Sequence, residues 1–147
     1  MNKQDIMPPI TPYLTVKGAA DAIAFYKKAF GATENARMPA PDGKRLIHAD
    51  IAVNGGRILM SDEFPEHSEE CGGAVFVPTS DKPVGVAIAL HYAKPAEIDA
   101  TYRRAIEAGC KSVQEPQDMF WEARFAMLSD PFGHRWMLNA PLPVKKA

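Results

Sequence analysis

The chain has 147 residues, of which 46 % are hydrophobic and 24 % charged, so it can bury one sizeable core and we expect one compact domain. Its net charge of -1 provides no basic excess, and nucleic acid is therefore not an expected partner. No apolar run approaches the roughly 20 residues needed to cross a bilayer, and Met1–Asp5 lacks the apolar centre of an export signal. These features predict a cytoplasmic protein that does not engage a membrane.

The first half of the chain predicts a strand, a helix and three further strands. Apolar and mixed residues alternate over Ile10–Val16, which is typical of a strand. An apolar stripe predicts a helix over Ala19–Phe30, and Gly31 is a suitable residue to end it. The three strands that follow are expected at Thr33–Met38, Leu46–Val53 and Arg57–Asp62.

The segment Phe64–Pro83 is long and rich in glycine, proline and acidic residues. This composition favours a solvated linker or a flap that separates two halves of the chain. We expect the halves to cover about residues 8–65 and 84–140, joined by residues 66–83.

The second half repeats the order of the first. An apolar strand is predicted at Val84–His91 and a helix at Lys94–Ala108. Three strands follow: one begins at Val113, the second covers Phe125–Leu128 and the third covers Arg135–Asn139. The last two are joined by Asp130-Pro131-Phe132-Gly133, in which proline and glycine suit a tight turn.

The two predicted helices also end in similar sequences, Tyr26-Lys27-Lys28-Ala29 and Tyr102-Arg103-Arg104-Ala105. We interpret the chain as a duplicated βαβββ module, and the fold class as α+β. Each module would bury one face of a curved mixed sheet under its helix. Two such modules would place their other faces around a cleft, where ligands commonly bind.

Several motifs resemble the vicinal oxygen chelate superfamily, which includes glyoxalase I, extradiol dioxygenases and bleomycin resistance proteins. They are Pro12–Val16, Ala24–Ala32 and Asp130–Trp136. His48–Asp50, Leu59–Glu66 and Asp118–Trp121 resemble its PhnB-like branch more narrowly. The resemblance implies a homodimer and a small-molecule ligand, but it does not specify a reaction.

Metal-dependent members of that superfamily hold a divalent ion with His and Glu ligands. The resemblance places the four ligand positions near Thr11, Met60, Ala87 and Met137, and none of these is a usual ligand for such an ion. We therefore predict no metal and no cofactor.

Strand alternation then predicts which other residues face the ligand. Tyr13 and Thr15 would accompany Thr11, and Asp62 would accompany Met60. His91 would lie on the same side as Ala87, and Arg135 and Asn139 on the same side as Met137. The alternative is that Tyr13 and Met137 only fill the interior of their sheets.

Two further groups are candidates for function. His48, with Asp50 on the same strand face, is a candidate general base because histidine titrates near neutral pH, although a hydrogen-bonded scaffold role is the alternative. Phe120 and Trp121, close to Arg124, are predicted to form a wall or lid, or else to pack at a subunit interface.

Two functions from different classes follow from these residues. The first is metal-free binding of a flat or aromatic molecule, with Tyr13, Met60, Asp62, His91, Phe120, Trp121, Arg124, Arg135 and Met137 as ligand-binding residues. The second is a lyase or isomerase of the lactoylglutathione lyase type, either metal-free or metal-dependent with non-standard ligands, with His48 as base and Arg135 or Arg124 holding an anion. Cys71 and Cys110 are read as free thiols, with a disulfide between them as the alternative.

Overall fold

The computed structural model describes residues 7–70, 77–79, 81–82 and 84–144. Met1–Asp5, Cys71 and part of the predicted linker lie outside the described residues. The chain forms two compact units, residues 1–27 with 31–77 and residues 28–30 with 78–147. In the described part of the chain, no helix is both long and apolar enough to span a membrane.

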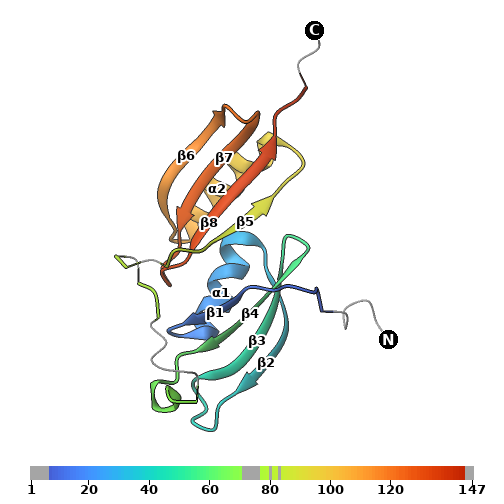
Figure 1. Cartoon of the computed structure of the whole chain (residues 1–147). Helices are drawn as coiled ribbons and strands as arrows, with labels where there is room; N and C mark the ends of the chain where they lie inside the picture. Colours follow the sequence, from blue (N-terminus) through green and yellow to red (C-terminus); the bar gives the residue numbers. More distant parts are fainter. Residues whose placement is uncertain (1–6, 71–76, 80, 83, 145–147) are drawn as a thin grey trace. The chain divides into compact units, whose positions relative to one another are not determined.

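The first unit has one helix and a four-stranded sheet (Figure 1). Strands β1 and β4 are parallel neighbours, and the sheet order is β1-β4-β3-β2. A short 3₁₀ turn, Pro65–His67, follows the last strand. The elements are β1 (Tyr13–Val16), α1 (Ala19–Phe30), β2 (Thr33–Pro39), β3 (Leu46–Val53) and β4 (Gly56–Asp62).

The helix α1 begins and ends where the sequence predicts. Gly31 adopts a left-handed backbone, with φ of 69°, and its amide donates to the Lys27 carbonyl oxygen at 3.1 Å. Glycine accepts this conformation without the steric cost of a side chain. The core side chains of the helix, Ile23 and Tyr26 among them, are fully buried.

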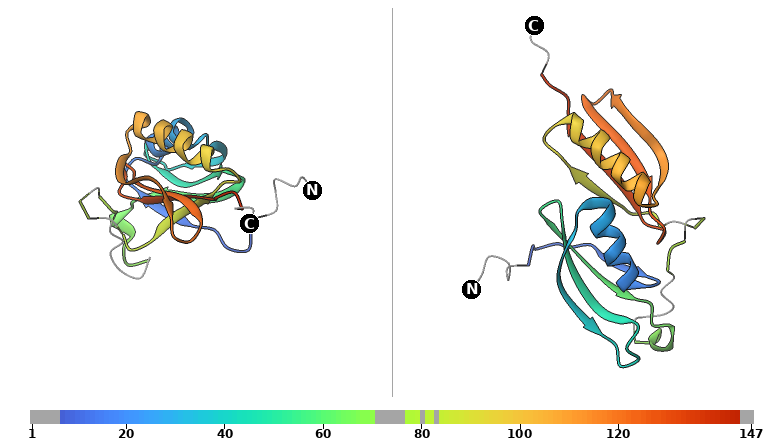
Figure 2. Two further views of the ribbon diagram at one scale, coloured as in Figure 1. Left: turned by 90° about the horizontal axis from the view of Figure 1, so that it is seen from above. Right: turned by 180° about the vertical axis from the view of Figure 1, so that it is seen from behind.

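The second unit repeats the same order of elements. Its sheet order is β5-β8-β7-β6, with β5 and β8 parallel, and α2 lies across one face of that sheet (Figure 2). The elements are β5 (Ala87–His91), α2 (Pro95–Ala108), β6 (Lys111–Met119), β7 (Ala123–Ser129) and β8 (Arg135–Pro141). The predicted α+β fold of two βαβββ modules is confirmed.

Two predicted strands start later than expected. The first strand begins at Tyr13 rather than Ile10, and β5 begins at Ala87 rather than Val84. Pro12 lacks the amide hydrogen needed for a regular ladder, and Ile10 is 88 % exposed. Residues 10–12 are therefore loop, and residues 84–86 are loop as well.

The turn between β7 and β8 is organised by the buried carboxylate of Asp130. It accepts hydrogen bonds from the Phe132 amide at 2.8 Å, the His134 amide at 2.9 Å and the indole Nε1 of Trp136 at 2.8 Å. The Gly133 amide donates to the Asp130 carbonyl oxygen at 3.2 Å, which closes the predicted tight turn. This conspicuous motif therefore supports the fold of the second unit.

Candidate functional site

The first sheet has one buried face and one open face. Along β1, Leu14 and Val16 are buried, whereas Tyr13 is 51 % exposed. Because neighbouring residues of a strand point to opposite faces, Tyr13 and Thr15 lie on the open face. The Tyr13 hydroxyl lies 3.0 Å from His48 Nδ1, so a hydrogen bond joins β1 to β3 across this face. Tyr13 and His48 are therefore brought together as a polar, accessible pair.

Asp50 lies on the same open face as His48, but its carboxylate is already paired. It accepts hydrogen bonds from Arg57 Nε at 2.8 Å and from Asn35 Nδ2 at 3.2 Å, and the second guanidinium nitrogen of Arg57 also contacts it. The hydrogen bonds from Arg57 are the largest cause of a pKa of Asp50 below its usual value, although burial opposes them. Asp50 therefore remains an ionised acceptor and is unsuited to proton transfer at neutral pH.

The predicted orientation of β4 is wrong by one residue. In the parallel ladder, Leu14 is opposite Met60 and Val16 is opposite Asp62. Met60 and Asp62 therefore share the buried face of Leu14 and Val16, and Met60 is completely buried. On the open face beside Tyr13 and Thr15, β4 instead presents Leu59 and Ser61, which sequence analysis did not select.

The position of Asp62 on the buried face has a clear structural cause. One carboxylate oxygen accepts the amide hydrogens of Gly18 at 2.7 Å and Ala19 at 2.9 Å, at the start of α1. The other accepts the amide hydrogen of Leu46 at 2.7 Å. A negative group at a helix N-terminus is favourable because it satisfies amides that have no partner within the helix. Asp62 therefore stabilises the first unit and does not line the open face.

The open face of the second sheet agrees with the predicted alternation. His91 is opposite Asn139, Ala89 is opposite Met137 and Ala87 is opposite Arg135 in the β5–β8 ladder. The intervening residues Trp136 and Leu138 are fully buried on the helix side. His91, Arg135 and Met137 thus lie on the face that the sequence predicted, and their roles in ligand binding remain predictions.

The neighbouring strand β7 adds two apolar residues that sequence analysis missed. Met127 is opposite Met137, and Phe125 is opposite Asn139. Both are partly exposed, as is Met137. The alternation of Phe125, Met127 and Ser129 is the signal that could have identified them. Two methionines and a phenylalanine give this face an apolar, polarizable floor.

Trp121 is held over the end of this floor. Its indole Nε1 donates a hydrogen bond of 3.2 Å to Asn139 Oδ1, and its ring packs edge-on against Phe125 with centroids 5.4 Å apart. Phe120, in contrast, is 91 % exposed at the tip of the β6–β7 turn and contacts Trp121 edge-on. Trp121 is therefore positioned by the open face, whereas Phe120 projects into solvent.

Arg124 lies on the opposite, helix-covered side of the second sheet. It donates to the Asp99 carboxylate of α2 at 2.8 and 2.9 Å, and to Asp118 of β6 at 2.9 Å. These partners, Asp99 foremost, hold the pKa of Arg124 above its ordinary value. The prediction that Arg124 holds a ligand on the open face is wrong, because two carboxylates tie it between α2 and β6.

The residues described do not fit a metal centre of the His- and Glu-ligated kind. The corrected register puts Leu59 and Ser61 at the β4 position, and the β5 and β8 positions carry Ala87 and Met137. Within residues 7–70, 77–79, 81–82 and 84–144, no three His, Cys, Asp or Glu side chains gather closely enough to hold an ion. His48 and His91 remain the two imidazoles on open faces, one in each unit.

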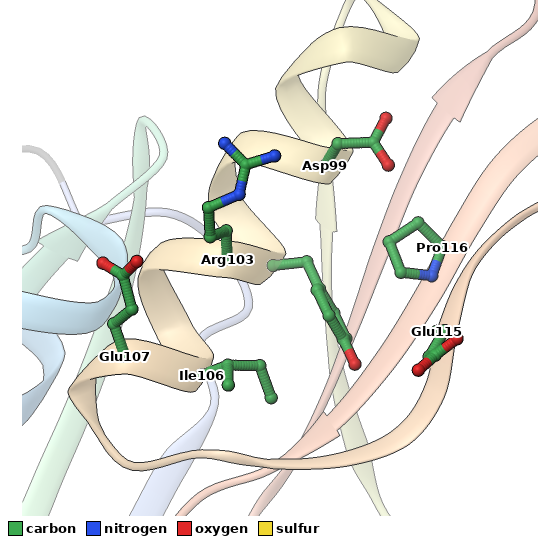
Figure 3. A pocket seen from close by; sticks show the side chains of 7 residues that line it. Asp99, Arg103, Ile106, Glu107, Glu115 and Pro116 are labelled. Carbon is green, nitrogen blue, oxygen red and sulfur yellow. The ribbon is translucent and has the colours of Figure 1, made fainter.

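Two other features of the second unit are set apart from this face. A shallow hollow of about 500 Å³ lies between α2 and β6, lined by Asp99, Tyr102, Arg103, Ile106, Glu107, Glu115 and Pro116 (Figure 3). It contains none of the residues selected from the sequence.

Cys110 is a free, buried thiol whose pKa is raised to about 12 by burial, which makes it unreactive.

Comparisons with known proteins agree with this architecture. An uncharacterized protein of Mycobacterium bovis is 40 % identical over 138 residues, covering 94 % of this chain and 86 % of the relative. A PhnB protein from Bacillus cereus superposes with a TM-score of 0.67 at 19 % identity, covering 90 % of this chain and 99 % of the other. A protein from Pseudomonas aeruginosa gives a TM-score of 0.70 at 24 % identity, with 95 % and 100 % coverage.

Residues 7–138 match the family described as Glyoxalase/Bleomycin resistance protein/Dioxygenase superfamily. This match spans both βαβββ units, and structures of the same family share the fold. The resemblance seen in the sequence motifs is thereby confirmed. The chain belongs to the Glyoxalase/Bleomycin resistance protein/Dioxygenase superfamily.

Proposed function

We propose that this protein binds a small, flat organic molecule on the open face of its second sheet, without a metal ion. The observation that supports this proposal is the partly exposed floor of Met127 and Met137, which ends at Trp121. Methionine sulfur and aromatic rings favour contact with polarizable, planar groups. Asn139 and Phe125 hold the indole in place, so little conformational freedom would be lost when a ligand stacks against it.

A thermal-shift screen tests this proposal. Planar aromatic compounds, among them N-phenyl-1-naphthylamine, are added to the full chain with and without a chelator, and the melting temperature is followed by tryptophan fluorescence. We expect at least one compound to raise the melting temperature, with no effect of the chelator. Met137→Gln keeps the length of the side chain but makes the floor polar, and should abolish the shift.

The matched control is Met7→Gln, which makes the same change at an exposed methionine before β1. This variant should respond to the compounds as the wild type does. A panel that leaves the wild type unaffected, or shifts that survive Met137→Gln, would reject the proposed site. Shifts that require added Mn²⁺ or Zn²⁺ would instead favour a metal-dependent protein.

A second candidate function is supported by the Tyr13–His48 pair. An accessible imidazole hydrogen-bonded to a tyrosine hydroxyl is a suitable general base, because the hydroxyl fixes the orientation of the ring. Under this alternative, the protein is a lyase or isomerase of the lactoylglutathione lyase type, and His48 removes a proton from a substrate carbon. Binding is favoured over it because Asp50, the carboxylate on the same strand face as His48, is already paired with Arg57.

The hemithioacetal of methylglyoxal and glutathione is the substrate to test for this alternative. Turnover by the wild type that is lost in His48→Gln and reduced in Tyr13→Phe would establish it. Asn35→Ala, on the same sheet but outside the pair, should leave such turnover unchanged. No turnover with or without Mn²⁺, Ni²⁺ or Zn²⁺ would leave binding as the function.

We also propose that the protein is a cytoplasmic homodimer. Strand edges at β1 and β5 and the exposed aromatic tip at Phe120 are features that association commonly covers. The buried thiol of Cys110 is compatible with a reducing compartment. Light scattering should give about twice the 16.1 kDa mass of the chain; a monomer mass throughout the micromolar range would contradict the dimer.

A further inference from the structure

Arg135, on the open face of the second sheet, differs from Arg57 on the first in the pairing of its side chain. Its Nε is buried and makes no hydrogen bond within the part of the chain that the structure describes. Arg57, on the first sheet, is instead paired with Asp50. The Nε of Arg135 is therefore a buried hydrogen-bond donor that no residue in the described part of the chain satisfies.

The residues beside Arg135 in the sheet supply no charged partner for its side chain. In the ladder, Ala87 of β5 and Ser129 of β7 flank it, and neither carries a charge. The next residue on the same face of β8 is Met137. No carboxylate occupies a position adjacent to Arg135 in either neighbouring strand.

A buried, unsatisfied donor on a charged group is unfavourable for folding. Such a cost is commonly retained where a ligand supplies the missing acceptor. Guanidinium groups bind carboxylate, sulfonate and phosphate oxygens particularly well, since two parallel N–H donors match two oxygens. The expected partner of Arg135 is therefore the acidic group of a ligand.

We propose that the ligand of the second sheet is an aromatic anion whose acidic group pairs with Arg135. This inference rests on the proposed function and specifies the class of molecule. The planar part lies over Met137 and Met127, and the carboxylate, sulfonate or phosphate group lies at the Arg135 end of β8. Trp121, held by Asn139, closes the opposite end.

The spacing along β8 limits the size of this molecule. Arg135 and Asn139 are four residues apart on one strand, and a strand rises by about 3.3 Å per residue, so their backbone positions are separated by roughly 13 Å. A molecule of two or three rings with an acidic group at one end matches this length.

Two fluorescent probes of the same shape separate the anion from the rings. 8-Anilinonaphthalene-1-sulfonate and N-phenyl-1-naphthylamine share the same ring systems, but only the first has a sulfonate. We expect the wild type to bind the sulfonate at least about tenfold more tightly, as is typical of one charge-assisted hydrogen bond. Arg135→Gln should remove this preference and leave the affinity for the neutral probe unchanged.

Arg103→Gln is the matched control, because it removes the same charge from an exposed position on α2. It should preserve the preference for the sulfonate. Arg135→Gln should also leave the melting temperature of the ligand-free protein unchanged or higher, since no internal partner is lost. A lower melting temperature would indicate a structural role for Arg135 and overturn the inference.

The remaining outcomes distinguish this inference from the proposed function. Equal binding of both probes by the wild type, with loss of both in Met137→Gln, would reject the anion and retain the site. A preference for the sulfonate that survives Arg135→Gln would also reject the role of Arg135. If neither probe binds, or if Met137→Gln affects neither, the proposed function fails and the inference fails with it.

Discussion

The indole Nε1 of Trp136 donates a hydrogen bond of 2.8 Å to the carboxylate of Asp130, and both residues are buried. The same carboxylate accepts the backbone amides of Phe132 and His134. A single side chain thus joins the turn that precedes β8 to the largest core residue of the second unit. The Asp130–Trp136 motif is conspicuous in the sequence for a structural reason.

Asp130→Ala should therefore destabilise the protein strongly. It removes the carboxylate that accepts from a buried indole and two backbone amides, and we expect the free energy of unfolding to fall by about 3 kcal/mol. Urea denaturation monitored by fluorescence measures this loss. Asp42→Ala is the control, since Asp42 also accepts two backbone amides in a turn but is exposed; an equal loss in both variants would contradict the role of burial.

Gly133 should tolerate no side chain. Its φ is 86°, and a Cβ atom built on it would lie 2.4 Å from the carbonyl carbon of Pro78. Gly55 has a similar φ of 80° but nothing within 4 Å of the corresponding position. Gly55→Ala should cost only the backbone term of about 1 kcal/mol, whereas Gly133→Ala should cost a further 1–3 kcal/mol, roughly, from overpacking.

Thermal or urea unfolding of the two alanine variants provides this comparison directly. Because the backbone term is shared, the difference between them isolates the contact with Pro78. Similar stabilities for both variants would show that Pro78 does not approach Gly133 in solution.

The Asp50–Arg57 pair should make stability depend on pH at the acidic end. The pKa of Asp50 is lowered in the folded protein, from an ordinary value of 3.8, chiefly by the hydrogen bonds from Arg57. The unfolded chain therefore binds this proton more readily, so the stabilisation is complete above pH 3.8 and is lost as the pH falls through the folded pKa. Asp50→Asn should flatten this part of the stability curve.

Two further variants separate the contributions of Arg57 and Asn35 to the pH dependence of stability. Arg57→Gln should flatten the acidic part of the curve more than Asn35→Ala, since Asn35 contributes less to the lowered pKa of Asp50. Urea unfolding between pH 6 and 2.5 gives the curves. Identical acid slopes in wild type and Asp50→Asn would show that this carboxylate is not the group that titrates.

The sequence was most informative where alternation is regular. The sequence predicted the helix α1 and the Asp130–Gly133 turn correctly. It also predicted the open face of β8, because Arg135, Met137 and Asn139 alternate with the apolar residues Trp136 and Leu138. In β4, by contrast, Ile58, Leu59 and Met60 are apolar in succession, so hydrophobicity does not determine the face. Asp62 was assigned to the open face because a charged residue is usually exposed. Its carboxylate is buried because it accepts hydrogen bonds from the amides of Gly18 and Leu46, which the sequence does not reveal.

Arg124 was misplaced for a related reason. An arginine in a strand suggests a solvent-facing position, yet this one lies under α2 because Asp99, twenty-five residues earlier in the chain, reaches it. The partner is distant in sequence, and no local pattern connects the two residues. That the Nε of Arg135 has no partner among the described residues is equally hidden in the sequence, because the uncharged neighbours Ala87 and Ser129 are brought beside it only by the sheet.

The register of β1 and β4 determines which residues of the first unit lie on its open face, and it can be tested by paired substitutions. Met60 is fully buried opposite Leu14, whereas Leu59 is partly exposed opposite Tyr13. Met60→Ala should lower the free energy of unfolding by about 2–5 kcal/mol because it leaves a cavity in the core. Leu59→Ala should cost about 1 kcal/mol, typical of a substitution outside the core.

Thiol labelling provides an independent measure of the same register. In a Cys71→Ser background, Leu59→Cys should react with a water-soluble maleimide in the native protein, while Met60→Cys should react only after unfolding. Cys110 is buried in both and supplies an internal reference for the unfolded state. If Met60→Cys were labelled and Leu59→Cys protected, β4 would be shifted by one residue, and Met60 and Asp62 would return to the open face beside Tyr13.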